Sequence, residues 1–151
     1  MEEAIVRVEH LSHRYSVDWA IRDINLEVKS KGVFGLLGSN GAGKSTTMNI
    51  ICGVLNQTEG NVWINNINLR ENPVEAKKFI GFLPQRPPLY PDMTVEEYLT
   101  YCANLRLMEP MEIGKAVERA MARCGVTHFR SRLLRNLSGG YQQRIGIAQA
   151  I

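Results

Sequence analysis

The chain has 151 residues and a formal net charge of +3, with 44% hydrophobic and 22% charged residues. This length suits one domain with one hydrophobic core, and the composition excludes a low-complexity or disordered chain. The longest apolar run, residues 50–55, is far shorter than the roughly 18 residues that begin to indicate a membrane span, and the sequence does not open like a secretory signal. We therefore expect a soluble globular protein.

The cysteine, histidine and charge patterns exclude some other classes. Cys52, Cys102 and Cys124 lie far apart without a Cys-x-x-Cys pair, which favours reduced thiols over a disulfide framework or a zinc site. No histidine has acidic or cysteine neighbours at ligand spacing, so the histidines are expected to be structural. The basic residues are dispersed apart from a cluster at 130–135, which we interpret as a solvated face; no nucleic-acid partner is expected.

The sequence before residue 38 predicts β-strands. Apolar and polar residues alternate over residues 5–8 and again over residues 21–28. Residues 33–37 are almost wholly apolar, which predicts a strand buried on both faces. Residues 44–53 have the length of a helix and no charge after the first residue, so this helix is expected to be enclosed nearly all round.

Two further strand signals follow in the first half of the chain. Residues 61–69 are expected to form a hairpin that turns at Asn65 and Asn66. Residues 79–83 predict another short buried strand, which Pro84 ends. The first half is therefore expected to be rich in strands.

Helix signals dominate the second half. Thr94 followed three residues later by Glu97 predicts a capping box at the start of a helix that runs to about residue 106. Apolar residues recur at helical spacing over residues 113–124, and Gly125 suits the left-handed stop after that helix. Residues 92–135 are thus predicted to form a small helical subdomain.

A pattern of glycine, four residues, glycine, lysine and serine lies between a predicted strand and a predicted helix, as in a phosphate-binding loop. It consists of Gly38, Ser39, Asn40, Gly41, Ala42, Gly43, Lys44 and Ser45. Glycines let the backbone curl so that N–H groups point at phosphate oxygens, and the following helix adds its positive end. Lys44 can reach the β- and γ-phosphates, the Ser45 hydroxyl can ligate Mg²⁺, and Thr46 is placed for the α-phosphate. The alternative is an accidental glycine turn, against which the flanking strand and helix argue.

A second glycine motif begins the last predicted helix. It reads Leu137-Ser138-Gly139-Gly140-Tyr141-Gln142-Gln143-Arg144. Taken alone, it is equally well an ordinary helix start, with Ser138 as N-cap and the glycines as a loose first turn of a helix running through residue 151. Together with the phosphate-binding loop, it resembles the signature sequence of ATP-binding cassette (ABC) ATPases. The resemblance covers essentially the whole chain, with its motifs in order and at plausible spacing.

This resemblance implies an α/β fold, that of a P-loop NTPase of the ABC type. An antiparallel β-subdomain and a partial parallel-sheet core with the phosphate loop would occupy residues 1–91, and the helical subdomain residues 92–135. The signature motif and the start of its helix would occupy residues 136–151. The chain, residues 1–151, is expected to be a single nucleotide-binding domain without the C-terminal part of its core.

Two residues gain a role only through the resemblance. Tyr15 lies 29 residues before Lys44, where the family places an aromatic ring that stacks on adenine. By itself, Tyr15 would be read as a packed aromatic at a strand end. Gln85 follows the strand predicted at residues 79–83 and matches the glutamine of the family's Q-loop, which senses Mg²⁺ and the attacking water. By itself, Gln85 would be read as a solvated loop residue.

The resemblance also implies partners. Two ABC ATPase subunits meet head to tail, so Ser138, Gly139 and Gly140 of one chain would contact the γ-phosphate held by Lys44 of the other. Residues 86–95 resemble the corresponding stretch of export-type members, in which this surface receives a short helix from a separate membrane subunit. The expected complex contains a second nucleotide-binding subunit and transmembrane permease subunits, and lies at the cytoplasmic face of the cell membrane.

The sequence departs from the family pattern at two positions. Ser39 stands where many members have proline, and Tyr141 where many have glutamine. Neither change removes a phosphate contact, although Tyr141 can alter packing at the dimer interface.

Part of the family's catalytic set has no candidate here. The aspartate that completes the Mg²⁺ shell, the general-base glutamate and the switch histidine follow the signature helix in the family, whereas this sequence stops at Ile151. Lys44 and Gln85 are therefore the catalytic residues expected in this chain. We expect a truncated subunit that binds ATP and Mg²⁺ without hydrolysing ATP by itself.

Three functions stay open from the sequence. The first is the ATP-hydrolysing subunit of a membrane transporter. The second is an ABC ATPase with a soluble task in translation or DNA repair, although the 53 residues from Gln85 to Ser138 leave no room for the long coiled coils of the repair relatives. The third is a nucleotide-binding module that does not hydrolyse.

Overall fold

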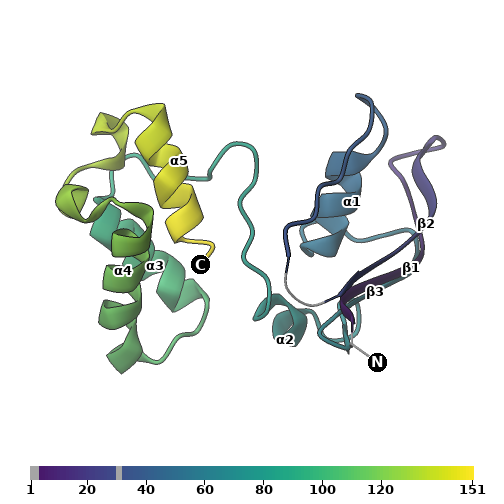
Figure 1. The fold of residues 1–151 in the computed structure, drawn as a ribbon, viewed down its shortest axis with the longest axis horizontal. Coiled ribbons are helices and arrows are strands. Elements are labelled where there is room, and N and C mark those ends of the chain that lie inside the picture. Colours follow the sequence, from purple (N-terminus) through teal and green to yellow (C-terminus); the bar gives the residue numbers. More distant parts are fainter. Residues whose placement is uncertain (1–3, 30–31) are drawn as a thin grey trace. The chain divides into compact units, whose positions relative to one another are not determined.

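A computed structural model of the chain describes residues 4–29 and 32–151. The chain divides into two compact units, Met1–Ile80 and Gly81–Ile151 (Figure 1). The first unit contains a sheet and two helices, and the second unit is helical. No helix in the described part of the chain combines the length and the apolar character needed to cross a bilayer.

The sheet of the first unit has four antiparallel strands in the order β2-β1-β3-β4. Its strands are β1 (Ala4–Arg14), β2 (Trp19–Lys29), β3 (Glu59–Ile64) and β4 (Ile67–Asn68). The long central strand β1 pairs with both neighbours, so that Val8 faces Leu26 on one side and Val62 on the other. The two N-terminal strands predicted from alternation are confirmed, and both extend further than the alternation indicated.

The predicted hairpin is also confirmed. β3 and β4 are joined at Asn65 and Asn66, whose φ angles of 50° and 63° are those of a tight hairpin turn. Asparagine tolerates this left-handed backbone better than most residues do, which explains why the pair marks the turn in the sequence.

One face of the sheet packs against helices α1 (Lys44–Ile51) and α2 (Pro73–Lys77). Their shared core consists of Val8, Leu11, Ile21, Ile50, Val62, Ile64, Leu69 and Ala76. The prediction that the first of these helices is enclosed nearly all round is wrong, because only Thr46, Thr47 and Ile50 are buried while Met48 is 44% exposed. A helix with uncharged but polar and small residues can present one side to solvent without a desolvation cost.

The two buried strands predicted at residues 33–37 and 79–83 are irregular backbone in the structure. Val33, Phe34 and Leu37 are exposed. A parallel strand is held by hydrogen bonds to neighbouring strands, and no strand of the described residues pairs with either segment. The parallel part of the predicted sheet is therefore absent from the described residues, and the sheet they form is antiparallel.

The second unit consists of three α-helices that pack side by side, with two short 3₁₀ turns (Figure 1). These elements are α3 (Val95–Leu105), α4 (Pro110–Cys124), η1 (Thr127–Phe129), η2 (Leu134–Asn136) and α5 (Gly139–Ala148). Its core is a continuous apolar cluster centred on Met121, Val126, Leu134 and Ile145, which are fully buried. The predicted helices are thus present, but the compact unit that contains them is Gly81–Ile151 rather than residues 92–135, because α5 shares their core. α5 ends at Ala148 rather than at residue 151.

The predicted start of α3 and the predicted end of α4 are confirmed. α4 ends at Gly125, whose φ of 65° and ψ of 38° are left-handed. At the start of α3, Glu97 N–H donates to Thr94 Oγ1 at 3.3 Å, and Thr94 N–H donates to Glu97 Oε2 at 2.8 Å. The Thr94 backbone N–H, and then its hydroxyl, hold the pKa of the Glu97 carboxyl below its ordinary value.

This capping box makes the stability of the chain sensitive to acid. Because the pKa of Glu97 is lowered by folding, its ionised carboxylate stabilises the fold above an unfolded pKa of about 4.5, and this contribution is lost as the pH falls through the lowered pKa. Glu97→Gln is therefore expected to lower the urea midpoint at pH 7, and its difference from the unsubstituted chain is expected to shrink as the pH falls below about 4.5. An equal difference at neutral and at acidic pH would contradict this account.

Candidate functional site

The loop over residues 38–43 curls tightly before α1. Gly41 and Gly43 have φ angles of 85° and 84°, which side chains rarely adopt. A Cβ at Gly43 would also overlap the Ile21 side chain and lie 2.8 Å from the Ala20 carbonyl oxygen, both in β2. Glycine is therefore required at residue 43 both for its backbone conformation and for its contact with the sheet.

The loop holds the Lys44 side chain. Lys44 Nζ donates to the Gly38 carbonyl oxygen at 2.8 Å and to the Ser39 carbonyl oxygen at 2.6 Å. An ammonium group has three N–H donors, so these bonds leave a third for an anion over the loop. The positive charge thus lies directly on the curled backbone that the sequence motif predicts.

The first turn of α1 adds backbone donors next to this lysine. The first helical bond runs from Thr47 N–H to the Gly43 carbonyl oxygen at 2.9 Å, so the N–H groups of Lys44, Ser45 and Thr46 precede the helical pattern. No acidic side chain lies in this turn. Backbone donors, the helix dipole and the Lys44 ammonium together form a site for a polyanion such as a triphosphate.

Tyr15 lies beside this loop and is linked to it. Its hydroxyl group is 3.3 Å from the hydroxyl oxygen of Thr46 in α1, and its side chain is 66% exposed. The Tyr15 ring also makes an edge contact with the ring of His13, with centroids 4.8 Å apart and an angle of 86° between the planes. The structure thus brings an exposed aromatic ring next to the first turn of α1, and the adenine contact implied by the resemblance stays a prediction.

The other predicted site residues belong to the second unit. Gln85 is exposed on irregular backbone, and Ser138, Gly139 and Gly140 are exposed at the start of α5. Ser138 occupies the predicted N-cap position, but its side chain makes no capping hydrogen bond. A glutamine that the sequence reasoning did not single out supports this turn: Gln142 Nε2 donates to the carbonyl oxygens of Leu134 at 3.1 Å and Leu137 at 3.2 Å.

The basic cluster at 130–135 and Tyr141 take part in internal contacts. Arg130 forms ion pairs with Glu96 at 3.2 Å and Glu118 at 3.6 Å, and Arg135 forms one with Asp92 at 2.6 Å. The Tyr141 ring makes an edge contact with the Phe129 ring, with centroids 4.6 Å apart. These arginines therefore contribute to the fold of the second unit as well as to its surface charge.

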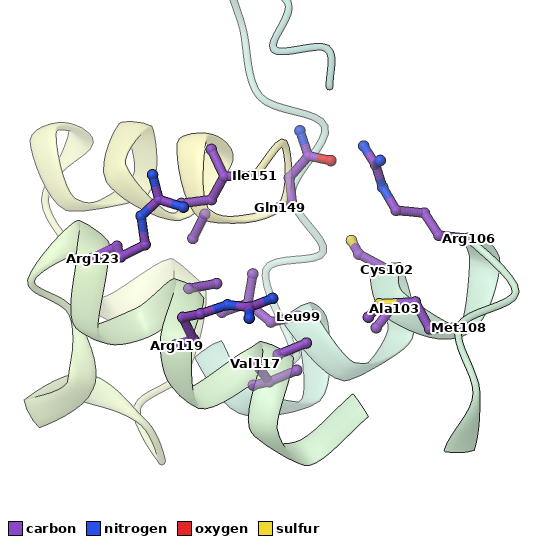
Figure 2. Close-up of a pocket in the computed structure, with 13 residues that line it drawn as sticks. Leu99, Cys102, Ala103, Arg106, Met108, Val117, Arg119, Arg123, Gln149 and Ile151 are labelled. Carbon is purple, nitrogen blue, oxygen red and sulfur yellow. The ribbon is translucent and has the colours of Figure 1, made fainter. Parts of the chain in front are cut away.

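A separate cavity of about 140 Å³ lies among α3, α4 and the end of α5 (Figure 2). Arg119 and Arg123 of α4 and Arg106 at the end of α3 line it, together with apolar side chains and Cys102. Burial raises the pKa of the Cys102 thiol. No residue of either glycine motif lines this cavity, so it is distinct from the phosphate loop.

Comparison with known proteins places this site in a family. The ABC transporter family profile matches residues 21–151. The molybdate/tungstate import ATP-binding protein WtpC of Pyrococcus abyssi is 35% identical over 147 residues, which are 97% of this chain and 42% of that protein. The chain therefore spans less than half the length of this curated relative.

Solved structures confirm the predicted fold. The structure of an ATP-binding subunit of an ABC transporter matches with a TM-score of 0.86 and 27% identity over 97% of this chain and 61% of its own. A dimeric post-hydrolysis ATP-binding cassette bound to ADP and Pi matches with a TM-score of 0.82 and 29% identity over 97% of this chain and 68% of its own. On the sequence profile, the relative and these two structures together, the chain belongs to the ABC transporter family.

Proposed function

We propose that this chain binds ATP with Mg²⁺ as the nucleotide-binding part of an ABC transporter, in which ATP hydrolysis drives transport through separate membrane subunits. The proposal rests on the curled loop at residues 38–43, which holds the Lys44 ammonium group next to the start of α1, where the first backbone N–H donors of this helix lie. A triphosphate is the ligand that this combination of donors suits best.

Different residues of the first unit contact different parts of the ligand. Lys44 contacts the β- and γ-phosphates, and Thr46 contacts the α-phosphate. The exposed Tyr15 ring, linked to Thr46 through its hydroxyl, stacks on adenine, a contact worth about 1 kcal/mol. In this arrangement the base contact lies directly after β1 and the phosphate contacts lie on α1, in the same unit.

The donor set also fits Mg²⁺ carried with the phosphates. In the described part of the chain, no group of three histidine, cysteine or acidic side chains could hold a metal ion. Mg²⁺ commonly keeps most of its ligands as water and phosphate oxygens and takes only one or two from protein. Ser45, exposed at the start of α1, would supply the hydroxyl ligand, and the contact that the resemblance assigns to Gln85 would come from the other unit.

The signature motif supports a head-to-tail dimer. Ser138, Gly139 and Gly140 are exposed at a helix start, with backbone donors that can reach the γ-phosphate bound to a second copy. The matched cassette bound to ADP and Pi is itself dimeric. Hydrolysis is proposed for the transporter complex, to which this chain contributes Lys44 and Gln85.

The membrane partner is proposed to dock next to Gln85. Within residues 86–95, three prolines stiffen the stretch that precedes α3, and Tyr90 and Asp92 in this stretch are exposed. The export-type subclass predicted from this loop finds no support in the comparisons, since the Pyrococcus abyssi relative is named as an import protein. The proposal therefore includes separate permease subunits at the cytoplasmic membrane face and leaves out the direction of transport.

Calorimetric titration of the purified chain tests the central claim. Binding of ATP with Mg²⁺ and of inorganic tripolyphosphate is expected, with ATP the tighter ligand because of its base. Absence of heat with both ligands up to millimolar concentration would reject the phosphate-loop assignment. Co-purification of the chain from cells with a multispanning membrane protein supports the transporter role, whereas co-purification with ribosomes supports the soluble alternative.

A further inference from the structure

We infer that His13 is a positioning residue for the nucleotide base: it fixes the orientation of the Tyr15 ring. The inference rests on the proposed function, because Tyr15 must be the stacking residue for its orientation to matter. His13 lies in β1, and Tyr15 follows it by two residues, directly after Arg14, the last residue of the strand. The two rings are therefore close in sequence, and they meet where the chain leaves the sheet.

The contact between the rings joins an anchored ring to an exposed one. His13 is 7% exposed and Tyr15 is 66% exposed, and their rings meet edge to face at 86° with centroids 4.8 Å apart. This is one of the arrangements that aromatic pairs prefer. The buried imidazole thus provides a fixed surface against which the exposed ring rests.

The imidazole is itself held in place. His13 Nδ1 is 3.4 Å from Thr58 Oγ1, and the same hydroxyl oxygen accepts a hydrogen bond from Arg14 N–H at 3.2 Å. His13 also pairs with Ile21 across the β1 and β2 ladder. Backbone pairing and the Thr58 contact therefore fix the ring that supports Tyr15.

The surroundings of Nε2, the other nitrogen of the ring, indicate that His13 has a role beyond hydrogen bonding. Nε2 of His13 is buried and has no hydrogen-bond partner in the described part of the chain. A buried polar atom without a partner destabilises a fold, and an aliphatic side chain would fill the same space without this cost. Besides the Nδ1 contact with Thr58, the interaction that an aliphatic chain could not provide is the aromatic one with Tyr15.

Tyr15 is consequently restrained at both ends. Its hydroxyl group meets Thr46 at 3.3 Å and its ring meets His13, so rotation about both side-chain bonds is limited. Holding a ligand-binding group in its bound orientation improves affinity because less freedom is lost on binding. His13 acts through Tyr15 and contacts no part of the nucleotide.

Two substitutions separate the ring contact from the polar contact. His13→Gln keeps a group able to bond Thr58 and removes the ring, whereas His13→Phe keeps the ring and removes both nitrogens. We expect His13→Gln to weaken ATP binding about three- to fivefold and to leave tripolyphosphate binding within about twofold, and His13→Phe to bind ATP within about twofold of the unsubstituted chain. Calorimetric titration with each ligand gives these ratios.

A double-substitution cycle with Tyr15→Leu completes the test. In the Tyr15→Leu background, His13→Gln is expected to change ATP affinity by less than about twofold, because the residue it positions is gone. Unchanged ATP binding by His13→Gln, equal weakening of ATP and tripolyphosphate, or failure of phenylalanine to restore binding would each overturn the inference and leave the proposed function standing. If the unsubstituted chain binds neither ligand, the proposed function fails and the inference fails with it.

Discussion

Lys44→Ala is expected to weaken binding of both ATP and inorganic tripolyphosphate about 10- to 100-fold. The ammonium group is held over the phosphate loop by the Gly38 and Ser39 carbonyl oxygens, and a hydrogen bond between charged groups contributes about 1.5–3 kcal/mol. Because the lost contact is to phosphate, the ratio of the dissociation constants of Lys44→Ala and the unsubstituted chain should be the same for ATP and for tripolyphosphate, which lacks the base. Calorimetric titration with each ligand measures these dissociation constants.

A matched control separates local from general charge effects. Lys115→Ala removes the same charge from an exposed position on α4 and is expected to leave both affinities unchanged. Thermal unfolding of Lys44→Ala should stay close to that of the unsubstituted chain, since the Lys44 bonds lie on the exposed loop. Equal weakening by both substitutions, or tripolyphosphate binding that does not depend on Lys44, would remove the lysine from the site.

Met121→Ala is expected to lower the free energy of unfolding by about 2–4 kcal/mol. Met121 is 0% exposed at the centre of the core that joins α3, α4 and α5, so truncation removes buried apolar surface and leaves a cavity. A loss of this size is a large fraction of the stability of a small domain. Urea unfolding followed by far-ultraviolet circular dichroism measures it.

The same helix offers the control. Met111 lies near the start of α4 and is 92% exposed, so Met111→Ala removes the same atoms from solvent-exposed surface. Its expected effect is within about 0.5 kcal/mol. Similar losses for Met111→Ala and Met121→Ala would show that the packing around Met121 does not stabilise the unit.

Structural features that depend on a few neighbouring residues could be predicted from the sequence. The capping box at Thr94 and Glu97, the asparagine turn of the hairpin and the left-handed Gly125 each depend on a few neighbouring residues, and the structure has all of them. The phosphate loop belongs to the same class, since its glycines and Lys44 act within nine residues of one another.

Features that depend on distant partners could not be predicted in the same way. The apolar run at residues 33–37 indicates a preference for burial, but alternation and composition do not say which strand would pair with it. The Tyr15 and Thr46 hydroxyl groups are 31 positions apart in sequence, and only folding brings them to 3.3 Å. For His13, the separation of two positions from Tyr15 was an available signal, although Tyr15 lies just beyond the end of β1 and strand alternation does not account for the contact.

The fit of Gly43 against Ala20 and Ile21 has a consequence for how the protein can be altered. It joins the phosphate loop to the strand that pairs with β1, so the groups proposed for base and phosphates form one connected body. Gln85 and the signature residues belong to the other unit. The contacts proposed for Lys44, Thr46 and Tyr15 therefore depend on the folding of the first unit, whereas substitutions in residues 138–140 are expected to act on the proposed contact with a second copy.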